Sequence, residues 1–379
     1  MLNFLTSRTS FAGTKLLAID VGTASLSAVL AAEEHGGKLK ISKVFRFPFN
    51  LLIEGPKKQS ANAVLSNLKK VFAEAARAEP EVKKILISFS DPLVSERALR
   101  HIVERKPPFT PISESEIKFA IDEAAGKLSS ENPSLVAAKK EILGASVNGY
   151  AVTSPVNYRG KFFGINVLFT FISELLKKQA DEAREHFYPA AGLCFFSDAR
   201  VVFNTLKGTQ NLSEPLVLAD IGGEVTSVFH VSGDELRQAE PVAFGVRTLE
   251  RRASVFFKTD FSEAESILKK HLAGTLDTAL EEKAARFLDS ALEDWRVELK
   301  KHIDFFGEKT KKIMLTGGGG DLLVFTDAVK KEFGAVMPET GIQSLKAEAL
   351  KDHFVSLENL SGGKDVILAS LLSYCRDIC

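Results

Sequence analysis

The chain has 379 residues, of which 45% are hydrophobic and 26% are charged, a composition typical of a soluble globular protein with two or three domains. Lys and Arg number 49, and Asp and Glu also number 49, which argues against a protein that binds nucleic acid by neutralising many phosphates. Three cysteines without a Cys-x-x-Cys pair exclude a disulfide framework, and the isolation of Cys194 in the sequence indicates a reducing compartment.

Membrane and export signals are also missing from the sequence. The most apolar stretch, residues 165–172, is far shorter than the ~20 residues that a membrane-spanning helix needs. Residues 1–11 contain one Arg and a short apolar start, too little for a secretory signal peptide. We therefore expect a cytoplasmic protein that reaches a membrane only through a partner.

The chain contains an internal repeat. Residues 16–30 read LLAIDVGTASLSAVL and residues 216–230 read LVLADIGGEVTSVFH, so that an Asp, a Gly and a Ser recur at equal offsets. Each copy is an apolar run, an Asp-x-Gly turn and a second apolar run, which predicts a β-hairpin. A Gly-bearing turn and a further short strand follow each hairpin. We therefore expect two related α/β domains, each opening with a hairpin whose turn carries an Asp and a Gly.

Helical and strand-like segments alternate along the rest of the chain. Apolar residues at helical spacing predict a helix over 61–78, followed by a strand at 84–89. Ser113 and Glu116 form a capping-box pattern that predicts the start of a helix at 117–128. The further elements that we expect are strands at 141–147, 149–152, 162–171 and 312–316, and helices at 262–270, 276–306 and 364–374.

The β-rich block at 95–173 interrupts the first α/β unit. We expect it to be an inserted subdomain, an antiparallel sheet with the helix 117–128 on one face. Its most apolar strand, 165–171, is expected to be buried.

Three glycine-bearing turns follow apolar strands, at 20–23, 220–223 and 316–320. Glycines in such turns let backbone N–H groups approach phosphate oxygens, and an Asp nearby can hold a metal ion directly or through water. The sequence contains neither a Gly-Lys-Ser/Thr P-loop nor a Gly-x-Gly-x-x-Gly turn, which removes the usual NTPase and dinucleotide motifs. The turns indicate a phosphate-binding site of another kind.

The order of these turns resembles the actin-like ATPase superfamily, in which they are the phosphate-1, phosphate-2 and adenosine loops. Within it the chain looks most like the FtsA proteins of bacterial cell division and the related PilM proteins of type IV pilus assembly. The segments that carry the FtsA likeness are 20–24, 141–150, 241–245, 264–265 and 315–319. The resemblance implies an α/β fold of duplicated actin/ribonuclease H-like domains with an FtsA-type inserted α+β subdomain.

The resemblance also implies a nucleotide site in the cleft between the two halves, with ATP and Mg²⁺ as cofactors. Asp20 and Asp220 would hold the metal ion, and no catalytic residue is identified. The residues that match the family's nucleotide-binding positions are Asp20, Gly22, Thr23, Asp220, Gly222, Gly223, Thr226, Glu265, Gly317, Gly318 and Gly319.

The sequence departs from the FtsA pattern at the phosphate loops. Ser25 stands where the family usually has a Lys, and Glu224 and Val225 stand where it has a Gly and a Thr. Glu224 would bring a carboxylate with a Cβ near the phosphates, which disfavours a bound anion unless Mg²⁺ offsets the charge. We therefore expect weak or absent ATP hydrolysis.

The resemblance divides the chain into four parts. The parts are actin-like domain I at 1–94, 174–212 and 362–379, the inserted subdomain at 95–173, the core of domain II at 213–245 and 308–361, and its helical subdomain at 246–307.

The function implied is that of an ATP-binding cytoskeletal or scaffold protein in cell division, at the cytoplasmic face of the inner membrane. Nucleotide in the cleft would control polymerisation or the recruitment of protein partners through the inserted subdomain, without nucleic acid. A PilM-like scaffold of a type IV pilus or secretion complex is the alternative. A kinase or phosphatase of the same superfamily is a further alternative, for which we find no substrate-binding candidate.

Overall fold

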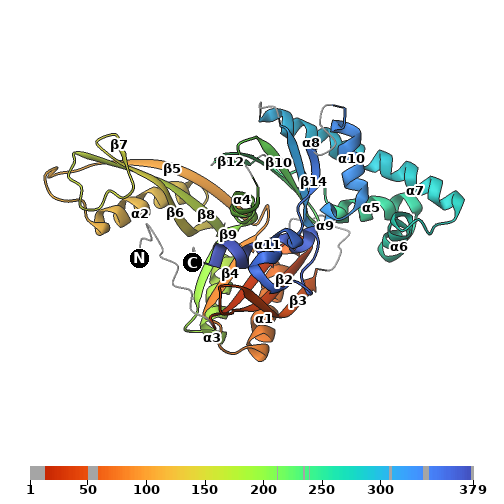
Figure 1. Cartoon of the computed structure of the whole chain (residues 1–379), viewed down its shortest axis with the longest axis horizontal. Helices are drawn as coiled ribbons and strands as arrows, with labels where there is room; N and C mark the ends of the chain where they lie inside the picture. The colour runs from red at the N-terminus through yellow and green to blue at the C-terminus, as the bar shows by residue number, and fades with distance from the viewer. Residues whose placement is uncertain are drawn as a thin grey trace.

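The structure is a computed structural model with three β-sheets. In Figure 1 two of them lie one above the other at the centre, and the third extends to the left. The structure describes residues 13–49, 59–210, 212–233, 235–238, 240–306, 310–335 and 341–376. Within those ranges every helix is too short or too polar to cross a membrane.

The first sheet has six strands and contains the first predicted hairpin. In pairing order its strands are β15 (Phe354–Ser356), β3 (Leu39–Pro48), β2 (Ser25–Glu33), β1 (Lys15–Val21), β4 (Lys84–Phe89) and β9 (Gly192–Ser197). Strands β1, β2 and β3 are antiparallel neighbours, whereas β4 runs parallel to β1 and β9 parallel to β4.

The second sheet repeats this order with five strands. They are β12 (Glu235–Gln238), β11 (Thr226–Ser232), β10 (Leu216–Ile221), β13 (Lys312–Thr316) and β14 (Ile342–Ser344). Strands β10, β11 and β12 are antiparallel, and β13 and β14 run parallel to β10. Asp20 pairs with Ser27 in β2, and Asp220 pairs with Ser227 in β11. The equal registers confirm the predicted internal repeat.

Helices pack on both sheets. In the first half, α1 (Gln59–Ala78) and α3 (Glu174–Phe187) cover the outer face of the sheet, and α4 (Asp198–Thr209) lies between the two halves. Those of the second half are α5 (Val246–Phe257), α6 (Phe261–Leu272), α7 (Thr278–Ala291), α8 (Glu293–Phe305), α9 (Gly317–Gly320) and α10 (Leu323–Phe333). Because side chains alternate along a strand, Leu17 and Ile19 pack under α1 and α3, while Leu16 and Ala18 face the other half.

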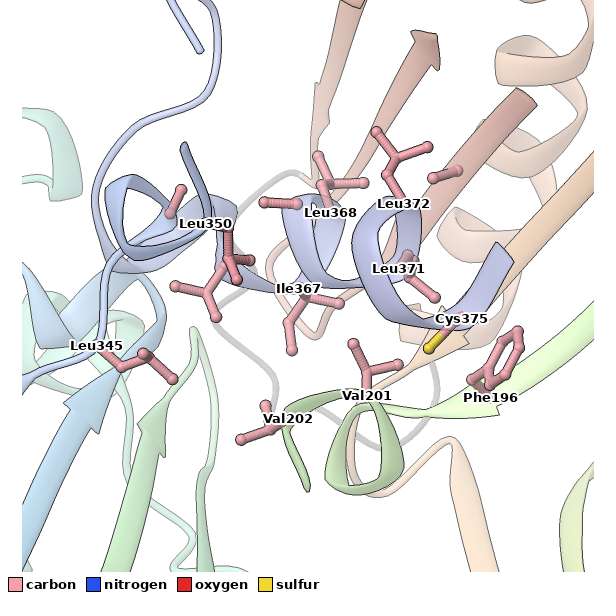
Figure 2. Close-up of a cluster of buried hydrophobic side chains, with 14 of the residues drawn as sticks. Phe196, Val201, Val202, Leu345, Leu350, Ile367, Leu368, Leu371, Leu372 and Cys375 are labelled. Carbon is pink, nitrogen blue, oxygen red and sulfur yellow. The ribbon is translucent and has the colours of Figure 1, made fainter. Parts of the chain in front are cut away.

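One apolar layer joins the two halves. It contains Leu16 of the first sheet and Leu218 of the second, together with α4 and the C-terminal helix α11 (Val366–Ser370), which continues as a π-helical turn over Leu371–Cys375. Figure 2 shows Ile367 and Leu371 of this C-terminal segment facing Val201 of α4. Two 3₁₀ helices, η2 (Ala347–His353) and η3 (Gly363–Asp365), lead the chain into it.

The third sheet lies within the predicted block 95–173 and projects from the first half (Figure 1). Its antiparallel strands, in pairing order, are β5 (Val94–Glu104), β8 (Phe162–Ser173), β6 (Leu135–Val147) and β7 (Tyr150–Val152). Helix α2 (Glu114–Glu131) covers one face, and the capping box of Ser113 and Glu116 is present. Residues 165, 167, 169 and 171 are buried beneath α2. The boundaries of the four predicted parts remain predictions.

Two sequence expectations need correction. The single helix expected over 276–306 is two helices, because the chain breaks at Leu292 between α7 and α8. Cys194 is disulfide-bonded, so the argument for a reducing compartment from an isolated Cys194 does not hold.

Candidate functional site

A cavity of about 730 Å³ lies between the two hairpin turns. Both halves contribute to its wall, because one turn follows β1 of the first sheet and the other follows β10 of the second sheet, and ligands of α/β sheets usually bind at the carboxyl ends of strands. The predicted site residues that line it are Asp20, Gly22, Thr23, Asp220, Gly222, Gly223, Glu265, Gly317 and Gly318. The structure therefore brings together residues that are up to three hundred positions apart in the sequence.

Two predicted site residues, Thr226 and Gly319, lie behind the cavity wall. The Thr226 hydroxyl is fully buried, donates to the carbonyl oxygen of Phe244 and accepts from Trp295 Nε1 at 3.0 Å. Gly319 packs so closely on Ile221 that a Cβ would lie 2.2 Å from its Cγ2. Both residues support the turns from behind, and their predicted part in nucleotide binding stays a prediction.

The backbones of the two hairpin turns are alike. The Gly22 N–H donates to Ser25 O at 3.0 Å, and the Gly222 N–H donates to Val225 O at 2.9 Å. The third turn packs on the second, because a Cβ on Gly317 would lie 2.3 Å from Asp220 Oδ1. Gly317 also has φ near +79°, a conformation that glycine adopts without strain.

Three carboxyl groups form the floor of the cavity: Asp20, Asp198 and Asp220. Burial, followed by the nearby charge of Asp220, raises the pKa of Asp20 to about 7. Burial and Asp91 raise the pKa of Asp220 to about 6, and burial and Asp20 raise the pKa of Asp198 well above its usual value. Sequence analysis missed Asp198, whose only signal was its place after the helix-capping Ser197.

The acidic floor suits a divalent cation. Asp198 Oδ1 is buried and has no hydrogen-bond partner among the described residues, so a positive charge there would offset desolvated negative charge. In the same part of the chain, no three Asp, Glu, His or Cys side chains are placed to coordinate one ion together. This donor set fits Mg²⁺, which is usually held by one or two carboxylates, water and substrate phosphates.

Basic side chains that the sequence analysis did not single out also line the cavity. They are Arg46, Arg247, Lys269 and Lys364. Arg46, on β3, forms an ion pair with the buried Asp365 at 2.8 Å. Ser25 lines the cavity too. No local motif marks these residues, because they come from four separate elements.

The Glu224 side chain forms an ion pair. Its carboxylate accepts two hydrogen bonds from the guanidinium of Arg251 on α5, one of them at 3.0 Å, and only about a tenth of its side chain is exposed. Its backbone N–H donates to Thr23 Oγ1 at 3.0 Å. Arg251 therefore offsets the charge of the carboxylate that the sequence analysis placed near the phosphates, and the effect of Glu224 on nucleotide binding stays a prediction.

The other end of the cavity belongs to the second half. Leu249, Leu268, Leu272 and Leu288 provide an apolar wall, beside the carboxylates of Glu250 and Glu265. Burial, followed by the charge of Glu265, raises the pKa of Glu250 to about 6. An apolar wall with carboxylates at its edge suits a flat heterocycle that carries hydroxyl groups.

No protein-family model and no curated protein sequence matches the chain. Among solved structures, the PilM–PilN type IV pilus biogenesis complex is similar with a TM-score of 0.59 and 16% identity, over 96% of this chain and 98% of that one. The ethanolamine utilization protein EutJ from Carboxydothermus hydrogenoformans has a TM-score of 0.49 and 12% identity, over 99% and 91%. A Bacteroides thetaiotaomicron protein with an actin-like ATPase fold has a TM-score of 0.45 and 11% identity, over 97% and 99%.

The first of these likenesses, with the repeated strand order of the two halves, confirms the predicted fold class. The chain has the actin-like ATPase fold, with duplicated halves. At this level of identity the likeness concerns the fold alone.

Proposed function

We propose that the chain is an actin-like scaffold protein that binds ATP with Mg²⁺ in the cavity between its halves and uses the bound state to recruit a protein partner. The observation that carries this proposal is the convergence of the three glycine turns on one cavity that has an acidic floor and an apolar end. Such a cavity offers separate surroundings for a metal ion, a phosphate chain and a nucleoside.

Each part of the cavity has a role in this proposal. The backbone N–H groups of the turns face the phosphate chain, with Arg46 and Lys364 nearby as cations. Asp20 and Asp220 hold Mg²⁺, which supplies the charge that offsets both the carboxylates and the phosphates when it is bound. The base lies against the leucine wall, and Glu250 and Glu265 accept hydrogen bonds from the ribose.

We propose weak hydrolysis or none. Phosphoryl transfer depends on positioned positive charge around the transferred group, and Ser25 provides none. The Glu224 N–H, which would otherwise face a phosphate, is taken by Thr23. The bound nucleotide then acts as a structural ligand.

The finer role that we favour is a PilM-like scaffold of a pilus or secretion complex, because the similar solved structure is a PilM–PilN complex. An FtsA-like role in cell division rests on the sequence motifs at the phosphate-1 loop. In both cases the inserted sheet is the partner surface that we propose, since Ile102 on its open face and Phe119 on α2 are more than half exposed. Association with the inner membrane would then occur through that partner.

Calorimetric titration with ATP, with and without Mg²⁺, tests the nucleotide site. We expect tighter binding with Mg²⁺, and about tenfold weaker binding in Asp20→Ala and in Asp220→Ala, equivalent to about 1.4 kcal/mol each. Asp289→Ala, which removes an exposed carboxylate of α7, is the control and should bind as the native chain does. Unchanged affinity in both site variants would show that the cavity is not the nucleotide site.

Co-purification with partners tests the inserted sheet. Ile102→Glu and Phe119→Glu should abolish self-association or partner capture and leave ATP affinity unchanged. Val355→Glu, an equally exposed apolar position outside this sheet, is the matched control. Partner capture that survives both substitutions would count against this surface.

A further inference from the structure

The two hairpin turns touch each other directly. A Cβ on Gly223 would lie 2.1 Å from the Cβ of Ala24, and the Glu224 N–H donates across the gap to Thr23 Oγ1. These contacts lie at the wall of the cavity, which both turns line, so a ligand bound there would lie against groups that already join the two halves. The described geometry is therefore a closed form in which the chain's own groups join the turns.

Arg247, at the start of α5, bonds to both turns. Its backbone N–H donates to Gly223 O of the second turn at 2.8 Å. Its guanidinium Nη2 donates to Ala24 O of the first turn at 3.0 Å and to Phe49 O, which follows β3. The Phe49 N–H also donates to Ala24 O at 2.8 Å. The two residues whose carbonyl oxygens accept from Arg247 are therefore hydrogen-bonded to each other.

The second turn and α5 form one rigid unit. A Cβ on Gly245 would lie 2.5 Å from Gly223 O, so the start of α5 packs on the turn without room for a side chain. Arg251, one helical turn after Arg247, holds Glu224 through its carboxylate. The unit therefore presents the Arg247 guanidinium and the Glu224 N–H together to the first half.

The hydrogen bonds of Arg247 lie away from the apolar layer that joins the two halves. The apolar layer of α4 and α11 joins the halves at one side (Figure 2), whereas Arg247 lines the cavity between the turns. Asp91 adds a separate bridge, since its Oδ2 accepts from Ser227 Oγ at 2.7 Å and from Gln238 Nε2 at 2.6 Å. Rotation about the apolar layer would break the Arg247 and Thr23 bonds without exposing the layer.

We propose that Arg247 is a clasp that holds the two halves closed, and that it must release Ala24 and Phe49 before a phosphate chain can enter between the turns. Hydrogen bonds to a charged group are stronger than neutral ones, and partial burial removes competing water. The clasp thus makes entry of an anionic ligand depend on an opening step. The part of this inference that concerns the ligand rests on the proposed nucleotide function, and the closed state does not.

Amide hydrogen exchange on the ligand-free chain tests the clasp directly. The Glu224 amide reports closure because it donates across the gap. In Arg247→Gln we expect its exchange to accelerate about tenfold, as the closed state loses charged hydrogen bonds. Arg252→Gln is the matched control, since Arg252 lies on the same helix and bonds to Ala291 O within the second half. Equal exchange in Arg247→Gln and the native chain would overturn the proposal.

Two further variants keep the test decisive. Thr23→Val removes the acceptor of the Glu224 N–H and sets the upper limit of its exchange rate. Arg247→Lys keeps the charge but has one donor nitrogen, so its exchange should lie between the native chain and Thr23→Val. If Arg247→Gln does not fold, native-like exchange in Arg247→Lys overturns the proposal.

Stopped-flow binding of a fluorescent ATP analogue tests the consequence for the ligand. Arg247→Gln should associate about tenfold faster than the native chain, while Arg252→Gln associates at the native rate. A faster-exchanging Arg247→Gln with unchanged association would overturn the gating role. If the native chain binds no nucleotide, the proposed function fails, while the exchange result still decides whether the clasp exists.

Discussion

The two hairpin turns have the same backbone conformation, but their side chains make different contacts. Asp20 and Asp220 occupy the same register, and the two turns close with equivalent hydrogen bonds from Gly22 and Gly222. Across the gap the first turn accepts, through Thr23 Oγ1 and Ala24 O, whereas the second turn and the helix after it donate. Duplication thus preserved the strand geometry, and the sequence around each turn made the two complementary.

The flanking positions diverge in the same way. Ser27 lies beside Arg46 on β3, whereas its equivalent Ser227 donates to Asp91 of the other half. Leu26 is buried among apolar groups, and its equivalent Thr226 bonds to Phe244 O and Trp295 instead. The second hairpin therefore depends on polar contacts where the first depends on apolar packing.

The largest expected effect comes from filling the contact between the turns. Gly223→Ala should destabilise the fold by about 3 kcal/mol, because its Cβ would overlap Ala24 Cβ and force the halves apart. Urea unfolding measures the change. Gly318→Ala is the control, since no described atom lies within 4 Å of the added Cβ, and it should alter stability by less than about 0.5 kcal/mol. Similar losses in the two variants would contradict a tight contact at Gly223.

The acidic floor predicts a dependence of stability on pH. The raised pKa values mean that the folded state binds more protons than the unfolded chain from about pH 4 to about pH 7, so stability falls as the pH rises through this window. Asp20→Asn should raise the free energy of unfolding by about 2 kcal/mol at pH 8 and change it least near pH 4, since the substitution removes a buried charge that is present only at the higher pH. Asp220→Asn should act in the same direction with a smaller gain.

Unfolding curves at several pH values, without Mg²⁺, measure both gains. Asp289→Asn serves as the reference, because the ion pair of Asp289 with Lys331 and Arg296 lowers its pKa. If Asp20→Asn instead lost stability at pH 8, the charge of the native Asp20 carboxylate would already be offset in the folded chain.

Thr226 and its equivalent Leu26 allow the stability contributions of the two hairpins to be compared at one matched position. Thr226→Val should cost about 1–2 kcal/mol, because Trp295 Nε1 and Phe244 O both lose a partner in a fully buried place. Leu26→Met, a volume-conserving change at the matching apolar position, should cost less. Thermal unfolding of both variants measures the difference, and an equal cost would remove the contrast between the hairpins.

Elements with a local signature in the sequence were predictable. The two hairpins, the strand at 84–89 and the capping box at Ser113 all have such patterns, and the structure confirms them. The break at Leu292 was not predicted, because an amphipathic pattern continues through it and the two helices have the pattern of one.

The candidate site was predictable only where a motif marked it. The carboxylates of the turns could be found, but Asp198 and Arg247 come from elements without a phosphate-binding motif and meet the turns only through the fold. The pairing of Glu224 with Arg251 was missed for the same reason, since Arg251 lies on α5 and no local motif joins the two residues. Local patterns specify backbone turns, whereas charge compensation depends on side chains that are distant in the sequence.

The smallest expected effect concerns the end of the cavity that only the second half builds. Glu265 forms an exposed ion pair with Lys269 at 2.6 Å, so Glu265→Gln should change stability by less than about 0.5 kcal/mol. If Glu265 accepts a hydrogen bond from the ribose, the same variant should bind ATP roughly threefold more weakly, as expected for one neutralised hydrogen bond of under about 1 kcal/mol.

Titrations with ATP and with 2′-deoxy-ATP then separate a contact with the 2′-hydroxyl from a general loss of charge. The native chain should prefer ATP and Glu265→Gln should not, whereas Lys269→Ala should keep the preference. A preference that persists in Glu265→Gln would place the ribose elsewhere and leave the leucine wall as the nucleoside contact of the second half.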